Sequence, residues 1–190
     1  MPLNPRLVAD IIQCLWLIFV LYWLVNAFGN KKNVYKQSHK SRLIFLLITT
    51  GFIYTIISIR RLHIQLLPAT MATQLAGIVL CAVGIGIAIW ARRVLGANWS
   101  GIVTLKQDHE LVRRGPYRFV RHPIYSGVLL AAAGTFVAIL PTLQGLICMT
   151  FLFTGLRLKS LYEEQILSQT FPDQYSQYRR EVKALVPFIY

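Results

Sequence analysis

The chain has 190 residues, of which 55% are hydrophobic and only 14% are charged, and its mean hydropathy is +0.52. Soluble domains normally carry about 25% charged residues, so this composition excludes an ordinary soluble domain and indicates a polytopic membrane protein. The net charge of +13 could suggest nucleic-acid binding, but basic loops beside an anionic cytoplasmic leaflet explain it better in so apolar a chain. We therefore expect membrane lipids, and no nucleic acid, among its partners. The three cysteines lie far apart in apolar runs, so no metal site is predicted.

Three apolar segments precede residue 92, and a membrane-spanning helix needs roughly 20 residues. They are residues 7–28, 43–59 and 69–91. The third is rich in small residues that permit close helix packing, namely Gly77, Gly84 and Gly86. Residues 1–91 are therefore predicted to form three amino-terminal transmembrane helices.

A fourth apolar block, residues 127–156, is interrupted by Pro141. A single helix of about 30 residues would be about 45 Å long, which is too long for a bilayer without strong tilt. Two helices that turn near Pro141 fit at least as well, and we predict such a hairpin. The predicted fold class is all-α, a polytopic membrane protein with about five transmembrane helices and with connector and tail helices on the cytoplasmic side.

Basic residues set the predicted orientation. Five Lys or Arg residues lie in the loop 29–42 and seven lie in the segment 92–122. By the positive-inside rule both face the cytoplasm, and the amino terminus lies outside. The hairpin would then return the tail to the cytoplasmic side, beside the segment 92–122.

The tail after Arg157 has apolar residues at helical spacing and predicts an amphipathic helix. The sequence FPD at 171–173 should end that helix. A second short helix, which carries Tyr175, Tyr178 and Val182, should then stop at Pro187.

The segment RRGPYRFVRHPIYSG, residues 113–127, places four arginines and a histidine beside an apolar block. Two tyrosines, two arginines, this histidine and two adjacent glutamates of the tail could bind a ligand: Tyr117, Tyr125, Arg118, Arg121, His122, Glu163 and Glu164. They suit a ligand with an aromatic ring, a carboxylate and cationic groups. S-adenosyl-L-methionine is such a ligand, and NADPH or a phospholipid headgroup would use similar groups.

The run HELVRRGPYRFVRHPIYSG (109–127) is followed, after the apolar block, by EEQILSQTFPDQYSQY. Together they resemble the isoprenylcysteine carboxyl methyltransferase family, which shares its carboxy-terminal signature with phospholipid N-methyltransferases. The resemblance covers about half of the chain. It implies a methyltransferase-like region at 92–190, with a cofactor loop at 98–127, a helical hairpin at 127–157 and a tail at 158–190.

The resemblance implies an integral membrane methyltransferase that uses S-adenosyl-L-methionine and a lipophilic acceptor entering from the bilayer. The expected reaction is carboxyl methylation of an isoprenylcysteine-like substrate, with the cofactor on the cytoplasmic side. The implied cofactor-binding residues are Ile102, His109, Glu110, Leu111, Val112, Tyr117, His122, Pro123, Ile124, Tyr125, Glu163 and Glu164. Lys159 matches the family's basic substrate-binding position, where eukaryotic relatives have arginine, and Arg157 lies nearby. No catalytic residue and no oligomeric state are predicted.

Three alternatives to this function stay open. The first alternative is N-methylation of a phospholipid or another amine. An amine acceptor must lose a proton, whereas a carboxylate is already ionised at neutral pH, so this difference mildly favours a carboxylate acceptor. The second is an NADPH-dependent membrane reductase of the sterol-reductase type, whose relatives carry a similar RHPxYxG region. His109 and the Glu-Glu pair argue against it. The third is a non-enzymatic scaffold, against which the nearly complete motif counts.

Overall fold

The computed structural model describes residues 1–26, 64–96 and 111–187, together with Leu43, Ile44, Leu47, Thr50, Gly51 and Tyr54. The elements assigned in this part of the chain are α1 (Pro5–Val25), α3 (Met71–Leu95), the short 3-10 helix η3 (Gly115–Arg118), α4 (Pro123–Ile139), α5 (Leu143–Thr170) and α6 (Pro172–Glu181). Within these ranges the only β structure consists of two isolated bridges. The predicted helical fold is confirmed.

Two of the three predicted amino-terminal spans can be compared with described helices. The first and third correspond to α1 and α3, which are the two described helices long and apolar enough to cross a membrane. Most of the second predicted span, 43–59, lies outside the described residues, although the six residues described there are helical. The count of five spans therefore stays a prediction.

Local signals explain where α1 and α3 begin. The Asn4 side chain accepts a hydrogen bond from the backbone of Arg6, and Pro5 occupies the first helical position, where its missing N–H costs nothing. Thr70 caps α3 and exchanges hydrogen bonds with Thr73, so two otherwise unpaired donors are satisfied.

Small residues bring α3 and α4 into backbone contact. A Cβ atom on Gly84 would lie 2.3 Å from the backbone nitrogen of Ala131, and one on Gly134 would lie 2.3 Å from that of Cys81. Such distances allow only glycine, as is typical of closely packed membrane helices. The predicted packing role is confirmed for Gly77 and Gly84. It is wrong for Gly86, which faces open space because it lies on another side of α3.

The predicted hairpin is confirmed. α4 ends at Ile139, Pro141 lies in the turn, and Thr142 caps α5 by accepting a hydrogen bond from Gly145. The carbonyl of Pro141 also accepts a hydrogen bond from Leu66, at 2.7 Å, so the segment before α3 runs beside the turn.

The predicted boundary between hairpin and tail at residue 157 does not correspond to a break in the helix. α5 continues for 28 residues to Thr170, because the composition becomes polar after Leu156 without any proline before Pro172. The predicted break at FPD is confirmed, since Phe171 ends α5 and begins α6. Val182 was expected in the last helix, but it has extended backbone and lies just beyond α6.

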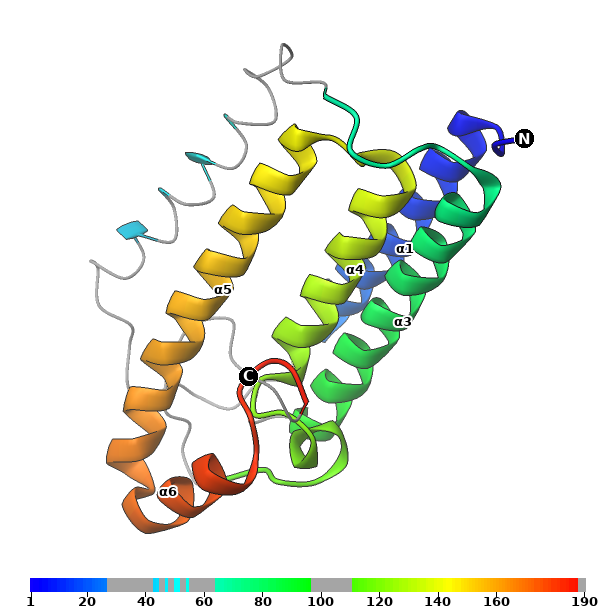
Figure 1. Cartoon of the computed structure of the whole chain (residues 1–190). Coiled ribbons are helices and arrows are strands. Elements are labelled where there is room, and N and C mark those ends of the chain that lie inside the picture. Colours follow the sequence, from blue (N-terminus) through cyan, green and yellow to red (C-terminus); the bar gives the residue numbers. More distant parts are fainter. Residues whose placement is uncertain are drawn as a thin grey trace.

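Figure 1 shows how these helices are arranged. The amino terminus lies at the same end as the α4–α5 turn, and α6 and the carboxy-terminal segment lie at the opposite end. At this opposite end the Arg92 guanidinium donates to the carbonyls of Asn26 and Gly96, at 2.8 and 2.6 Å. It thereby joins the last turns of α1 and α3, where a cation complements the helix dipoles.

Candidate functional site

The polar motif of the sequence lies at the end of the bundle opposite the hairpin turn. Gly115 adopts a φ of +61°, and a Cβ atom there would lie 2.9 Å from Val94 of α3, so glycine permits this approach. The short helix η3 then leads to His122, which precedes α4. Because α5 returns alongside α4, its polar half carries Glu163 and Glu164 to the same place. The predicted proximity of His122 and Glu163 is confirmed.

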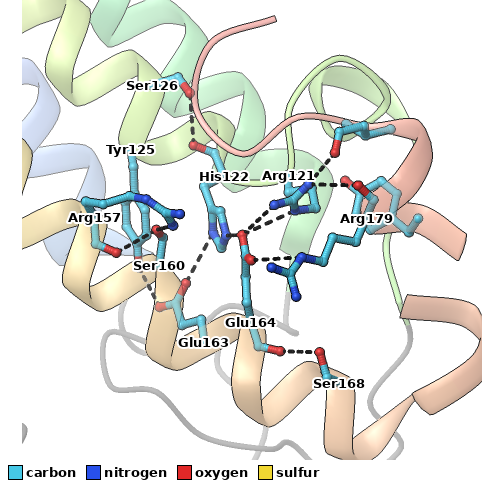
Figure 2. Close-up of polar contacts among 12 residues, drawn as sticks. Arg121, His122, Tyr125, Ser126, Arg157, Ser160, Glu163, Glu164, Ser168 and Arg179 are labelled. Atoms are coloured by element: carbon cyan, nitrogen blue, oxygen red, sulfur yellow. Dashed lines mark hydrogen bonds and ion pairs between the residues drawn. The ribbon is translucent and has the colours of Figure 1, made fainter. Parts of the chain in front are cut away.

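Glu164 lies at the centre of a buried polar cluster (Figure 2). Its Oε1 atom accepts hydrogen bonds from Arg121 Nη2 at 2.8 Å and Nε at 3.2 Å, and it lies 3.1 Å from His122 Nε2. The side chains of Glu164 and Arg121 are only 5% and 8% exposed. Arg179 Nε lies 3.9 Å from the other carboxylate oxygen. The hydrogen-bond partners of this carboxylate are thus side chains of the protein itself.

Glu163 has a different environment. It accepts a 2.5 Å hydrogen bond from the Tyr125 hydroxyl, and its other oxygen lies 3.5 Å from His122 Nδ1. Its side chain is 22% exposed. The rings of His122 and Tyr125 stack with centroids 5.5 Å apart, and the Lys159 ammonium lies 5.4 Å from the Tyr125 ring centre. Glu163 therefore lies beside two flat rings, and its side chain is more exposed than that of Glu164.

The two glutamates beside His122 favour the protonated form of its ring. Carboxylates accept hydrogen bonds and do not donate them, so both ring nitrogens need protons to bond Glu163 and Glu164. His122 precedes α4, and the two glutamates lie beyond the apolar part of α5. Burial alone would lower the His122 pKa, but its hydrogen bonds to the two glutamates raise that pKa above its usual value.

The two carboxyl groups respond in the opposite direction. Burial would raise the pKa of each, but the hydrogen bond with His122 lowers the pKa of Glu163 below its usual value. For Glu164, hydrogen bonds from His122 and Arg121 outweigh burial and lower the pKa to about 2. Both glutamates are therefore ionised at neutral pH.

Residues 182–185, which we call the carboxy-terminal strap, pack against the motif. The backbone N–H groups of Arg121 and His122 donate to the carbonyls of Lys183 and Ala184, at 2.8 and 3.0 Å. The Ser126 hydroxyl donates to the carbonyl of Leu185 at 2.5 Å. Ala184 and Leu185 are buried. The backbone N–H groups of Arg121 and His122 are thus fixed by a segment about 60 residues later in the chain.

The other predicted site residues lie in varied places. Tyr117 is buried, and its carbonyl accepts a 2.5 Å hydrogen bond from the Tyr178 hydroxyl. Pro123 is buried at the start of α4, and Ile124, Leu111 and Val112 are half-buried. Ile102, His109 and Glu110 lie outside the described residues. The cofactor and substrate roles of all these residues stay predictions.

Some members of the cluster were not among the predicted site residues. Arg121 was expected only as one of several donors for a ligand and not as a cofactor-binding residue, and the helix of the tail was expected to continue to Pro187, through the strap. The motif Arg-His-Pro shows that Arg121 directly precedes His122. Nothing in the local sequence indicates which acceptors the two side chains reach. Ser160 is fully buried on α5 and accepts a hydrogen bond from Arg157 at 3.1 Å, a contact that only the helical register places next to the cluster.

The chemistry of this cluster fits a cationic ligand with an aromatic part. The Glu163 carboxylate and the face of the Tyr125 ring attract positive charge, since the carboxylate is ionised and the face of a tyrosine ring is negative. Lys159 at the edge adds a positive group that suits an anionic partner. S-adenosyl-L-methionine has these features.

Fold and site together define an integral membrane protein, a helical bundle with a polar site at one end. Residues 72–174 match the phospholipid methyltransferase family, which is more than half of the chain, and the chain belongs to this family. Among similar proteins is the probable protein-S-isoprenylcysteine O-methyltransferase of Oryza sativa subsp. indica, with 31% identity over 115 residues. The protein-S-isoprenylcysteine O-methyltransferase of Saccharomyces cerevisiae is 32% identical over 123 residues, or 64% of this chain.

The match to these relatives is partial in length. The aligned region is 60% of this chain and 60% of the rice protein, and 52% of the yeast protein. The solved structure of a eukaryotic intramembrane Ras methyltransferase, isoprenylcysteine carboxyl methyltransferase, is similar with a TM-score of 0.53 at 24% identity. That similarity covers 82% of this chain and 55% of the other, and it supports the fold.

Proposed function

We propose that this protein transfers a methyl group from S-adenosyl-L-methionine to the carboxylate of a lipophilic, isoprenylcysteine-like acceptor. The observation that carries the proposal is the convergence of Tyr125, His122 and Glu163 at one end of the α4–α5 hairpin. These residues belong to the motif and to the Glu-Glu pair by which the chain resembles the isoprenylcysteine carboxyl methyltransferases. The names of its relatives agree with this activity.

The donor supplies an electrophilic methyl group on a positively charged sulfur. Toward it, Glu163 provides negative charge, and Tyr125 and His122 provide flat surfaces that exclude water. The protein's main contribution is alignment, because methyl transfer needs the acceptor in line behind the methyl group. An acceptor carboxylate is ionised at neutral pH and needs no base, which agrees with the raised pKa of His122, a shift that makes this histidine a poorer base.

Lys159 is suited to the acceptor. Its ammonium lies over the Tyr125 ring, at the edge of the cluster, where it can attract a carboxylate toward the donor site. The apolar part of α5 ends immediately before Arg157, close to Lys159 on the same helix. A lipid chain can therefore remain in the bilayer while its polar head reaches Lys159.

The orientation is part of the proposal. The amino terminus and the site lie at opposite ends of the bundle (Figure 1). The site end carries Arg92 and Arg93 at the end of α3 and the exposed residues Arg114, Arg118 and Arg180. An excess of basic residues favours the cytoplasmic side, so we place the site there and the amino terminus outside.

The decisive experiment is incubation of the purified full chain with S-adenosyl-L-methionine labelled in the methyl group and an S-prenylated cysteine. Base-labile label in the organic phase is expected, because methyl esters hydrolyse in alkali. Absence of transfer, together with absence of donor binding in equilibrium dialysis, would refute the proposed function.

The family to which the chain belongs also favours a second candidate, N-methylation of a phospholipid amine. The same incubation with phosphatidylethanolamine vesicles distinguishes the two reactions. Label that is stable to base and remains with the phospholipid would replace carboxyl methylation by N-methylation, while the donor site would remain as proposed.

A further inference from the structure

Two arginine–glutamate pairs connect the motif segment to the carboxy-terminal part of the chain. Arg113 pairs with Glu181, and the two side chains are 36% and 48% exposed. Arg121 pairs with Glu164, and these side chains are 8% and 5% exposed. Exposed pairs contribute little, whereas a buried pair has strict requirements for geometry and for additional hydrogen bonds. The buried pair meets these requirements.

Arg121 joins three parts of the chain with one guanidinium. Nε and Nη2 donate to Glu164 on α5, and Nη1 donates to the carbonyls of Val182 and Arg179. These carbonyls belong to the strap and to the last turn of α6. Only a planar group with several fixed donors can serve all these acceptors at once, so lysine cannot replace arginine here without losing contacts.

The acceptors of Arg121 also hold His122. Glu164 bonds Nε2 of its ring, and the strap accepts hydrogen bonds from the backbone N–H groups of His122 and of its neighbour Arg121. Glu164 is thereby surrounded by protein donors and has almost no accessible surface. Its neighbour Glu163 is more exposed, and it touches the other ring nitrogen and Tyr125. The two adjacent glutamates of α5 therefore differ in exposure and in the residues that they contact.

We propose that Arg121 and Glu164 are positioning residues, which act through His122 and the strap to hold Glu163 and Tyr125 in the geometry that receives the methyl donor. This proposal rests on the proposed function and reassigns Glu164, which the sequence predicted as a cofactor contact. In this proposal Glu164 bonds Arg121 and His122 and does not contact the donor, whereas Glu163 does.

The test measures the KM for S-adenosyl-L-methionine and for the prenylated acceptor separately, with the full chain in detergent. Arg121→Lys and Glu164→Gln should raise the donor KM by about 10- to 100-fold, since a small misplacement of a site can cost that much. The acceptor KM should rise less than the donor KM, because Lys159 lies at the edge of the cluster, over the Tyr125 ring. The double variant should be no worse than the worse single variant, since the two residues act together.

The matched controls are Arg113→Lys and Glu181→Gln, which alter the exposed pair between the same two regions. Both should leave each KM within about twofold of wild type, because surface pairs are weak.

A pH profile of donor binding adds a measurement that a general loss of structure would not change. His122 faces Glu163 and Glu164 from α5 and Tyr125 from α4, with Arg121 beside it and Arg179 behind Glu164. Removal of the Glu164 charge should move the His122 limb of donor binding to lower pH.

Should Arg121→Lys fail to fold, Ser126→Ala decides the matter, because it removes the hydroxyl that bonds both the strap carbonyl of Leu185 and the carbonyl of His122. A raised donor KM in that variant supports the proposal, and an unchanged one overturns it. An Arg121→Lys protein with the donor KM of the Arg113→Lys control also overturns it, as would equal losses of both substrates. A wild-type protein that neither binds nor uses the donor refutes the proposed function instead, so the two failures are distinguishable.

Discussion

At the scale of single residues, the site is organised around one imidazole. His122 lies between two carboxylates, one buried behind it and one more exposed beside Tyr125. The buried contact pairs charges within the protein, and the more exposed contact is the one that we propose to face the methyl donor. This division explains why two adjacent glutamates are both useful at the boundary of a membrane, where unpaired charge is costly.

Glu163→Gln should weaken binding of S-adenosyl-L-methionine by about 10- to 100-fold, since a hydrogen bond to a charged group contributes about 1.5–3 kcal/mol. Equilibrium dialysis with labelled donor measures the loss. Glu181→Gln removes an exposed carboxylate and serves as the control. Equal affinities in the two variants would show that Glu163 does not meet the donor.

The stability of the fold should depend on pH through the same cluster. The His122 pKa is raised, so its contribution is complete below its usual value of 6.5 and is lost as the pH rises through the raised value. The carboxyl pKa values are lowered, so their contribution is complete above the usual 4.5 and is lost, for Glu164, as the pH falls toward about 2. Thermal unfolding in detergent should therefore show greatest stability between these values, and Glu164→Gln should flatten the acid side. An unchanged acid side in that variant would contradict the assignment.

At the scale of elements, the contact of α3 with α4 positions the site. Glycines at 77 and 84 face glycines at 127 and 134 across the interface, so the two backbones touch. His122 precedes α4 directly, and its location follows from where α4 packs on α3. The unbroken course of α5 then carries Glu163 to the same depth.

Gly84→Ala should destabilise the protein by about 1–3 kcal/mol, because the added methyl group would lie 2.3 Å from the backbone of Ala131. Gly86→Ala, two residues away on the same helix, meets open space and should be neutral or stabilising by up to about 1 kcal/mol. Melting temperatures in the same detergent compare the pair. If both variants behave alike, the close contact of α3 with α4 is incorrect.

At the scale of the whole molecule, the bundle has two unlike ends. The amino terminus is tied to α3 by a 2.7 Å hydrogen bond from Leu3 to the Gln74 side chain, and this end also holds the hairpin turn. The other end holds the polar cluster, α6 and the strap. This polarity suits an enzyme that takes a soluble donor from one aqueous side and a lipid from the bilayer.

Cysteine labelling in sealed, oriented vesicles tests this arrangement. Asn4→Cys and Gln177→Cys place exposed thiols at the two ends, and a membrane-impermeant maleimide should label them from opposite sides. The unmodified chain is the control, because its cysteines lie in apolar helices. Labelling of both positions from one side would disprove the proposed orientation.

Periodic and local features of the sequence predicted much of this protein. Hydropathy predicted α1 and α3, Pro141 predicted the hairpin, and FPD predicted the end of α5, because each depends on neighbours in the chain. The motif and the Glu-Glu pair predicted which side chains would meet once the hairpin was assumed. The continuity of α5 was missed, since a change from apolar to polar composition was taken as a boundary although no helix breaker is present.

Tertiary structure alone decided how the meeting side chains share their contacts. Whether Glu163 or Glu164 is buried depends on the rotation of α5 against the motif, and adjacent residues in a helix differ by about 100° in direction. The role of the strap likewise depends on backbone hydrogen bonds, which any residue can form and which therefore leave no trace in side-chain chemistry. Residue identity was enough to predict a polar site at the membrane boundary, but the roles of its members follow from packing between segments far apart in the chain.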